Sequence, residues 1–273
     1  MRARPSLDGA TVLVTGAGNG LGRRLVLQAA RRGAAALVWD LDGAAAEATA
    51  ETVRAEGGRA EARTVDVADR GQVEAAAEAT LAGSGPVDVV VHNAGVVAGA
   101  PLLEAPAEAI ERTFAVNVLP LYWVTQAFLP TMLARQRGSV VTIASAAGLI
   151  GVARQTDYAA SKHAAVGFTE SLRAELRTAG ARVHTLLVCP FYLDTGMFDG
   201  VRTRWPRLLP ILDADDVATR VLDSLERGRA ELVLPPLARL TRPLRALPVG
   251  LYDRLADALG VNDTMTTFTG HGR

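Results

Sequence analysis

The chain has 273 residues and no net charge, because 29 lysines and arginines balance 29 aspartates and glutamates. A balanced charge excludes the basic excess that neutralises phosphates, so we expect no nucleic-acid partner. The single cysteine, Cys189, cannot form an internal disulfide, residues 1–8 lack the apolar core of a secretory signal, and no apolar run reaches the length of a spanning helix. With 49% hydrophobic residues, the composition predicts a globular cytoplasmic protein.

Short apolar runs alternate with helix-length segments over the first 190 residues. Buried parallel strands are predicted at 11–15, 36–40, 88–92, 139–144 and 183–188, with a weaker candidate at 60–65. Helices are predicted between them, at 21–32, 44–56, 72–81, 107–133 and 158–178. This alternation predicts an α/β fold in which a doubly wound, Rossmann-like parallel sheet has helices on both faces. No linker or repeat divides the chain, so we expect one domain over residues 1–273.

The pattern changes after residue 188. Residues 191–212 combine aromatic residues and prolines without a clear period, and we expect a lid over a substrate pocket or, alternatively, apolar core beneath a long loop. A helix at 214–227 and a strand at 231–234 are predicted next. The C-terminal tail, 235–273, is apolar up to residue 260, with interspersed arginines and with prolines that break any long helix. We expect it to make weak peripheral contact with a membrane or to form a subunit interface.

The first predicted strand runs into a glycine-rich turn that opens a helix. Residues 15–22 read T-G-A-G-N-G-L-G, and such glycines let the backbone approach a pyrophosphate at the helix N-terminus. The spacing G-x-x-x-G-x-G differs from the standard G-x-G-x-x-G fingerprint. Asp40, at the end of the second strand, could accept both adenosine ribose hydroxyls and repel a 2′-phosphate, which predicts NAD rather than NADP. Arg23 and Arg24 compete with this prediction, because an arginine can accommodate that phosphate.

Two other strand ends carry candidate cofactor contacts. Asp66, followed by Val67 after the third strand, could meet an adenine amino group or could equally cap the next helix. Asn93-Ala94-Gly95 follows the fourth strand, where small residues would let a cofactor ribose lie against the backbone. The same tripeptide could also be a plain turn.

Lys162 is the only lysine in the chain, and it follows Tyr158 by four positions. This spacing places a phenol and an ammonium on one helix face. A neighbouring cation favours phenolate, so we expect the pKa of Tyr158 to fall from about 10 and this residue to act as a general acid and base. Ser145, just after the fifth strand, could hold the substrate oxygen. The alternative is a lone lysine left by chance on a surface helix.

Together these residues resemble the compact single-domain branch of the short-chain dehydrogenase/reductase family over nearly the whole chain. The matching features, in order, are the turn at 15–22, Asn93-Ala94-Gly95, Asn117, Ser145 and the Y-x-x-x-K of Tyr158 and Lys162. The family's P-G-x-x-x-T loop appears at residues 190–195, with Phe191 in place of the glycine. Residues 39–40, 145–148, 157–158, 164–168, 195–198 and 265–270 resemble the retinol and hydroxysteroid dehydrogenase subgroup.

The resemblance implies a role for each matching residue. Tyr158 would be the catalytic acid/base, Ser145 would orient the substrate oxygen, Lys162 would lower the tyrosine pKa and bind the nicotinamide ribose, and Asn117 would hold a water in the proton relay. Thr195 would reach the nicotinamide carboxamide. The implied cofactor-binding set is Gly16, Asn19, Gly20, Leu21, Gly22, Asp40, Asp66, Val67, Asn93, Ala94, Gly95, Tyr158, Lys162, Pro190, Leu193 and Thr195.

The implied function is an NAD-dependent oxidoreductase that interconverts a lipophilic alcohol with its aldehyde or ketone. The family also implies a homodimer or homotetramer, paired through the helices at 107–133 and 158–178. No metal is expected, because His92, His163, His184 and His271 lack ligand spacing. One alternative is a cofactor-binding regulatory or membrane-associated scaffold with a vestigial site. Another is an epimerase that shares Y-x-x-x-K.

Overall fold

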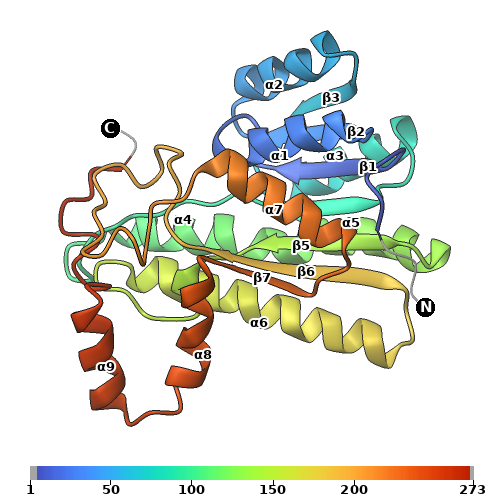
Figure 1. Cartoon of the computed structure of the whole chain (residues 1–273). Helices are drawn as coiled ribbons and strands as arrows, with labels where there is room; N and C mark the ends of the chain where they lie inside the picture. The colour runs from blue at the N-terminus through green and yellow to red at the C-terminus, as the bar shows by residue number, and fades with distance from the viewer. Residues whose placement is uncertain (1–4, 271–273) are drawn as a thin grey trace.

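The computed structural model describes residues 5–270, which form a parallel sheet between two layers of helices (Figure 1). Within these residues the sheet has seven strands in the order β3-β2-β1-β4-β5-β6-β7, and each neighbouring pair is parallel. The strands are β1 (Thr11–Thr15), β2 (Ala35–Asp40), β3 (Arg59–Thr64), β4 (Val89–His92), β5 (Gly138–Ile143), β6 (Val183–Pro190) and β7 (Glu231–Leu234). The predicted doubly wound sheet is therefore confirmed.

In chain order the helices are α1 (Gly20–Arg31), α2 (Gly43–Ala55), α3 (Arg70–Gly83), α4 (Ala107–Asn117), α5 (Leu119–Arg135), α6 (Thr156–Thr178), α7 (Ala214–Glu226), α8 (Thr241–Leu244) and α9 (Val249–Ala258), with 3-10 turns η1 (Ala146–Gly148) and η2 (Pro236–Leu240). Six of these helices, α1, α2, α3, α5, α6 and α7, pack apolar side chains against the sheet. One core cluster joins α1, α2 and α7 to the sheet, and a second joins α3, α5 and α6. Because successive strand residues face opposite sides, Val12 and Val14 enter the first cluster and Leu13 the second.

The single helix predicted over residues 107–133 was wrong, because the structure has two helices there. Val118 separates α4 from α5 with φ −118° and ψ −56°. Pro120 accounts for the break: proline has no N–H to donate to the preceding turn, and its ring suits the first turn of a new helix. The break leaves Asn117 at the end of α4, where its side chain can contact the loop that follows β4.

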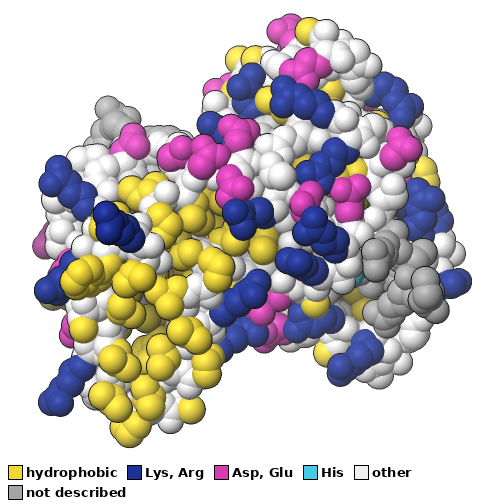
Figure 2. Space-filling model, viewed as in Figure 1, with side chains coloured by type: hydrophobic (Ala, Val, Ile, Leu, Met, Phe, Trp, Pro, Cys, Tyr) yellow, Lys and Arg dark blue, Asp and Glu magenta, His cyan; other side chains and the backbone are white. Residues whose placement is uncertain are grey.

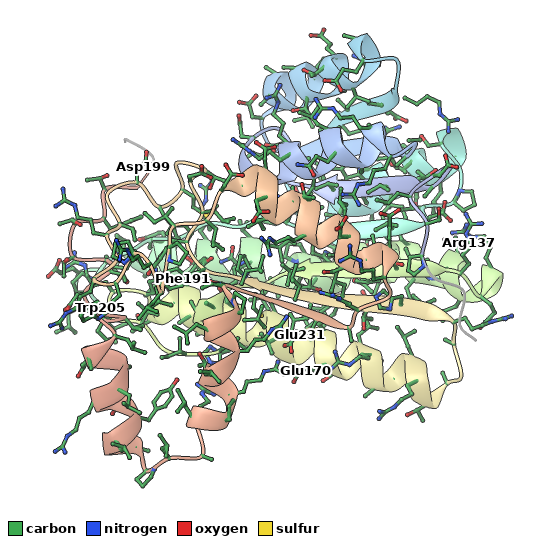
Figure 3. All side chains as sticks on the ribbon, in the orientation of Figure 1. Arg137, Glu170, Phe191, Asp199, Trp205 and Glu231 are labelled. Carbon is green, nitrogen blue, oxygen red and sulfur yellow. The ribbon has the colours of Figure 1, made fainter. Side chains whose placement is uncertain are left out.

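The residues after β7 form two short helical arms that project from the body of the protein (Figure 1). We call residues 236–258 the α8–α9 hairpin. Figure 2 shows hydrophobic side chains gathered over it. Glu170 of α6 and Glu231 of β7 lie at its base (Figure 3), and the Arg242 guanidinium pairs with them at 3.0 and 2.7 Å. Searched over residues 5–270, no helix has the length and apolar character to cross a membrane.

His92 at the end of β4 is buried, and one of its ring nitrogens lies 2.9 Å from Thr125 Oγ1. Burial lowers the pKa of this imidazole to about 3. Below about pH 6.5 the unfolded chain binds a proton at His92, whereas the folded protein stays unprotonated there until about pH 3. The free energy of unfolding therefore decreases as the pH falls from about 6.5 towards 3.

We therefore expect a His92→Gln variant to show a flatter dependence of unfolding free energy on pH than the unmodified protein. The difference in slope should approach about 1.4 kcal/mol per pH unit between pH 6 and pH 4. Urea unfolding at several pH values measures it. His163→Gln, at a less buried histidine of α6, is the control for exchanging histidine with glutamine. Parallel profiles for all three proteins would contradict the assignment.

Candidate active site

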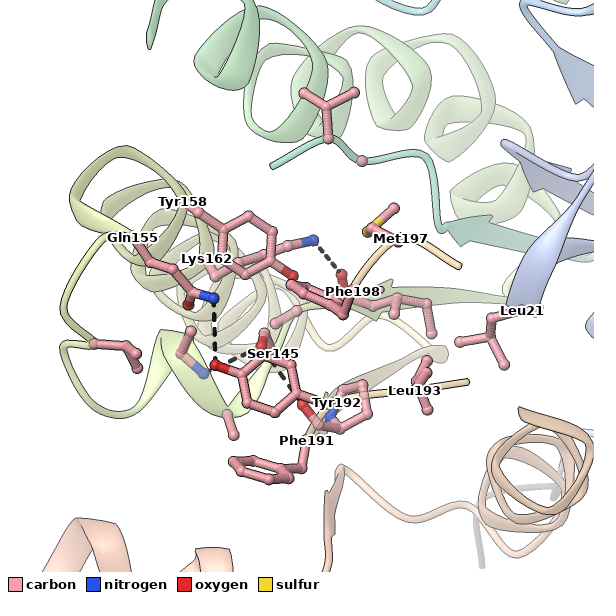
Figure 4. Close-up of a pocket in the computed structure, with 18 of the residues that line it drawn as sticks. Leu21, Ser145, Gln155, Tyr158, Lys162, Phe191, Tyr192, Leu193, Met197 and Phe198 are labelled. Carbon is pink, nitrogen blue, oxygen red and sulfur yellow. Dashed lines mark hydrogen bonds between the residues drawn. The ribbon is translucent and has the colours of Figure 1, made fainter. Parts of the chain in front are cut away.

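A pocket of about 640 Å³ lies at the carboxyl ends of the strands. It is lined by residues at or just after the ends of β1 to β6, by the start of α6, by residues 191–209 and by the α8–α9 hairpin (Figure 4). The strand order reverses between β1 and β4, and open α/β sheets bind ligands at such a point. The fold itself therefore positions this pocket as the candidate site.

The glycine-rich turn packs tightly against the loop that follows β4. Gly16 has a φ of +62°, and a Cβ built there would lie 2.8 Å from the Ala94 Cα. A Cβ on Gly22 would lie 2.2 Å from the Gly16 carbonyl oxygen, so only glycine lets α1 start so close to the turn. Gly16, Asn19, Gly20 and Leu21 line the pocket, whereas Gly22 lies behind it.

Asn93 holds these two loops together. Its side-chain amide donates to the carbonyls of Thr15 and Gly16, both at 2.9 Å. In return, Thr15 Oγ1 accepts the backbone N–H groups of Asn93 and Ala94 at 3.1 Å. Asn93, Ala94 and Gly95 all line the pocket, so the tripeptide is more than a plain turn.

Two carboxylates mark one end of the pocket. Asp40 accepts the backbone N–H of Gly18 at 2.7 Å, and Asp66 lies nearby with Val67. The alternative that Asp66 caps α3 is wrong, because Asp69 is the cap and accepts the Gln72 N–H at 3.1 Å. Asp66 instead accepts the N–H of Ala68 at 2.9 Å, within its own loop.

The two arginines that follow the turn point elsewhere. Arg24 pairs with Asp215 of α7 at 3.1 Å, and Arg23 donates to Thr52 Oγ1 of α2 at 3.2 Å. Neither side chain lines the pocket. The competing expectation that they would accept a 2′-phosphate there has no support in this arrangement.

Ser145, Tyr158 and Lys162 meet at the other end of the pocket (Figure 4). Ser145 follows β5, and its hydroxyl accepts the Ala147 N–H at 3.1 Å. The Lys162 ammonium lies 5.5 Å from the centre of the Tyr158 ring and donates to the Ile143 carbonyl at 3.0 Å. Lys162 is buried, so the alternative of a lysine on a surface helix is wrong.

Burial dominates the titration of this cluster. It raises the pKa of Tyr158 well above its usual range, with the Ser145 hydroxyl acting in the opposite direction. It also lowers the pKa of Lys162 to about 8. The expectation that the pKa of Tyr158 falls below about 10 is therefore wrong in this structure, because the loss of water around the buried phenol outweighs the effect of its polar neighbours. Tyr158 is a protonated phenol at neutral pH, and thus a proton donor.

Asn117 lies one layer behind the pocket wall and does not line it. Its Oδ1 accepts the Val96 N–H at 2.8 Å, and its Nδ2 donates to the Val96 carbonyl and to Ser161 Oγ, both at 3.0 Å. A Cβ on Gly95 would lie 3.3 Å from Asn117 Oδ1 and 3.5 Å from Lys162 Nζ. Gly95 thus leaves the space in front of both polar groups open.

Residues 191–212 form a loop whose ends meet, since Leu193 pairs with Leu212. Phe191, Leu193, Met197, Phe198 and Leu209 line the pocket, together with Pro190 and Thr195. Tyr192 and Leu209 are buried and line the pocket as well. Phe191 has no positive φ and its N–H donates to the Leu234 carbonyl at 2.8 Å, so this position does not need the family's glycine.

Sequence reasoning missed several pocket residues. Gln155, one helical turn before Tyr158, is buried in the wall and donates to Tyr192 Oη at 3.4 Å (Figure 4). Tyr192 Oη in turn lies 2.8 Å from Thr264 Oγ1. Only the i, i+3 relation of Gln155 to Tyr158 could have signalled its position. Tyr252 and Leu255 of α9 also line the pocket, and no local pattern indicates that.

The sequence of this chain is similar to those of known proteins. A family model described as short chain dehydrogenase matches residues 10–205. Epidermal retinol dehydrogenase 2 of Mus musculus is 39% identical over 272 residues, covering 98% of this chain and 88% of the relative. The 17-beta-hydroxysteroid dehydrogenase 13 of Homo sapiens is 36% identical over 233 residues, covering 85% and 77%.

Two solved structures are similar in fold and sequence. A short-chain dehydrogenase/reductase of Burkholderia phymatum in complex with NAD has a TM-score of 0.82 and 32% identity, covering 90% of this chain and 96% of that one. A metagenomic short-chain oxidoreductase in complex with NADP has a TM-score of 0.71 and 29% identity, covering 84% and 97%.

Proposed function

Because the chain belongs to the short-chain dehydrogenase family, in its retinol and hydroxysteroid dehydrogenase subgroup, we propose that the pocket binds NAD beside a lipophilic alcohol or carbonyl compound. The protein is an NAD(P)-dependent oxidoreductase that acts on CH–OH groups, and the resemblance read from its sequence is confirmed. Nothing supports the scaffold alternative. The observation that carries the proposal is the meeting of Ser145, Tyr158 and Lys162 in one pocket that continues to the glycine-rich turn.

The residues at the strand ends fit a dinucleotide. The turn presents the N-terminus of α1, where free backbone N–H groups attract a pyrophosphate. Asp40 supplies a carboxylate for a ribose, and a Cβ on Gly95 would fill space in front of Lys162. The bound nicotinamide supplies the hydride chemistry, and the protein supplies binding, orientation and a proton path.

We assign the proton transfer to Tyr158 Oη. In carbonyl reduction this phenol donates its proton to the substrate oxygen, and in alcohol oxidation the phenolate takes it back. Ser145 Oγ holds the same substrate oxygen, and the buried Lys162 ammonium stabilises the negative charge left on the phenol. Asn117 acts behind them by fixing Val96 and Ser161. The family resemblance adds the proposal that it holds a water of the proton relay.

The apolar wall opposite this cluster supports a lipophilic substrate, as the names of the relatives also do. We expect kcat/KM with NADH to rise with chain length or ring count across a series of aldehydes and ketones, from short aliphatic to retinoid and steroid compounds. Steady-state kinetics across the series tests both the enzyme class and the substrate class. A best substrate that is short and polar would overturn the lipophilic assignment.

The Asp40 carboxylate supports a preference for NAD. A 2′-phosphate would bring like charges together, which costs several kcal/mol in a partly buried site. We expect kcat/KM for NAD to exceed that for NADP by about 100-fold, equivalent to about 2.7 kcal/mol. Asp40→Ser should reduce this ratio to near unity, whereas Arg23→Gln and Arg24→Gln, outside the pocket, should leave it unchanged. Equal values for the two cofactors in the unmodified enzyme would remove this role of Asp40.

We further propose a single domain over residues 1–273 with residues 191–212 as its substrate lid, and a homodimer or homotetramer paired through α4, α5 and α6. Exposed Phe114, Leu119 and Tyr122 on α4 and α5 support the pairing. A cytoplasmic location agrees with the single, unpaired and buried Cys189. Weak peripheral membrane contact by the tail completes the proposal.

A further inference from the structure

The side-chain amide of Gln155 carries a polar atom that the protein leaves unpaired. Gln155 is 1% exposed and lines the pocket at the start of α6. Its Nε2 donates to Tyr192 Oη at 3.4 Å, and no described residue donates a hydrogen bond to its Oε1. Buried polar atoms without a partner are rare in folded proteins, because each one costs free energy that a hydrogen bond would recover. An unpaired amide oxygen in the wall of a pocket therefore indicates a ligand.

Hydrogen bonds behind the pocket wall determine which atom of the amide faces the ligand. Thr264 Oγ1 has a single proton, which it donates to the Val261 carbonyl at 2.8 Å. It must therefore accept the bond from Tyr192 Oη, 2.8 Å away. Burial raises the pKa of Tyr192, so this residue is a phenol whose one proton points at Thr264. Tyr192 can then only accept from Gln155, which turns its NH2 group to Tyr192 and leaves its oxygen for the pocket.

The wall around the amide is apolar. Val152 and Val261 line the pocket and are buried there in one hydrophobic cluster, against which Phe198 packs. A hydrogen bond is stronger in such surroundings than in water, because the local dielectric is low. The amide oxygen needs a donor, and a neutral hydroxyl supplies one, whereas burying the charge of an ammonium costs more free energy than the bond returns. The unpaired oxygen thus favours a hydroxyl group on the substrate.

Gln155 lies close to the residue to which we assign the proton transfer. It precedes Tyr158 by three positions, a spacing that places the Cβ atoms about 5–6 Å apart. In Figure 4 its amide lies beside Tyr158, and the dashed line joins it to the Tyr192 hydroxyl. The reacting oxygen of a substrate would bind between Ser145 and Tyr158. A second oxygen that reaches the amide is therefore attached to the carbon next to the reacting carbon or to the one after it.

We propose that the substrate of this enzyme carries a hydroxyl group on one of these two carbons and that Gln155 Oε1 accepts its hydrogen. The inference rests on the proposed function and narrows the lipophilic substrate to a hydroxyketone, a hydroxyaldehyde or the corresponding diol. In reduction the carbonyl carbon receives the hydride of NADH and its oxygen receives the proton of Tyr158, so the products are a diol and NAD. The second hydroxyl is unchanged. Gln155 determines specificity, and Tyr192 and Thr264 are positioning residues that orient its amide.

A long-chain methyl ketone and its derivatives with a hydroxyl or a methoxy group on the methyl carbon test the substrate class. Both groups withdraw electrons from the carbonyl, and only the hydroxyl can donate a hydrogen bond. We expect kcat/KM with NADH to be at least about tenfold higher for the hydroxyketone than for the methoxyketone. Equal values would overturn this inference and leave the proposed function in place.

Gln155→Met tests the amide itself, because methionine keeps the length of the side chain and removes both polar atoms. The ratio of kcat/KM for the hydroxyketone to that for the methoxyketone should fall to near one. The ratio is the informative quantity, since a general distortion of the pocket would lower both values alike. Gln126→Met, at an exposed glutamine of α5 outside the pocket, is the control and should keep the ratio. An unchanged ratio in Gln155→Met would overturn the role of the amide.

Thr264→Val tests the orientation of the amide without changing a residue that lines the pocket. Valine keeps the shape of threonine but accepts no hydrogen bond, so the Tyr192 proton should turn to Gln155 Oε1 and the NH2 group should face the ligand. That group donates to a hydroxyl and to an ether oxygen alike, so the same ratio should fall towards one. Thr264→Ser should restore it.

Thr266→Val is the matched control, because its hydroxyl donates to the Asp263 carbonyl at 2.7 Å in the same segment but is exposed. An unchanged ratio in Thr264→Val, or an equal fall in Thr266→Val, would overturn the assignment of the substrate hydroxyl to Gln155. Turnover of other aldehydes or ketones but not of the hydroxyketone would overturn the inference alone. No turnover of any carbonyl compound in either series would overturn the proposed function and this inference with it.

Discussion

Replacing Tyr158 by phenylalanine should lower kcat for carbonyl reduction by about 10²–10⁴-fold and leave NADH affinity within about twofold. The substitution removes only the phenolic oxygen, which is the group that we expect to donate the proton. The ring packs edge-on against Phe198 with their centres 5.8 Å apart, and phenylalanine keeps this contact. The side chains that pack around the ring should therefore keep their positions in the variant.

The measurement combines steady-state turnover with NADH titration by fluorescence. Tyr122→Phe removes a phenolic oxygen from an exposed position on α5, outside the pocket, and should behave as the unmodified enzyme. A near-normal kcat in Tyr158→Phe would contradict the assignment of Tyr158 as the proton donor. Loss of NADH binding along with kcat would instead show that the variant has lost the shape of the site.

The cofactor end of the site could be predicted from sequence because its chemistry is local. A strand, a glycine turn and a helix occupy one short stretch. Asp40 ends one strand and Asn93 follows another, and the apolar pattern gives the positions of both strands. Parallel strands bring their carboxyl ends to one edge, so these residues gather in the same pocket once the sheet order is known. Ser145 and Tyr158 follow the same logic at the neighbouring strand.

The substrate end could not be predicted in this way. Tyr252 and Leu255 reach the pocket only because the chain folds back after β7, and Gln155 depends on Tyr192, 37 residues further on. These are tertiary contacts with no local period. The predicted direction of the Tyr158 pKa shift was wrong for a related reason. The helical spacing shows that Lys162 is near, whereas the burial that raises the pKa comes from the surrounding fold. The break at Val118 could have been read from Pro120.

Replacing Lys162 by arginine should lower kcat/KM by at least about 100-fold, although the charge is kept. The ammonium fits a buried position where it donates to the Ile143 carbonyl at 3.0 Å and lies 3.5 Å from where a Cβ on Gly95 would be. A guanidinium is a larger planar fork and cannot occupy that space with the same contact. Because Lys162 is expected to hold the nicotinamide ribose as well, this variant should also bind NADH more weakly, unlike Tyr158→Phe.

The pH dependence of kcat distinguishes the effect of the Lys162 charge from the effect of its size and shape. Burial lowers the pKa of Lys162 to about 8, so the ammonium that stabilises the charge on Tyr158 is present below that pH and is lost as the pH rises through it. The kcat of the unmodified enzyme for reduction should therefore decline above about pH 8. The residual activity of Lys162→Arg should show no such decline, because arginine stays protonated. Arg177→Lys, exposed on the same helix, is the control for exchanging the two basic residues. Full activity in Lys162→Arg with an unchanged pH profile would contradict the role assigned to the Lys162 ammonium.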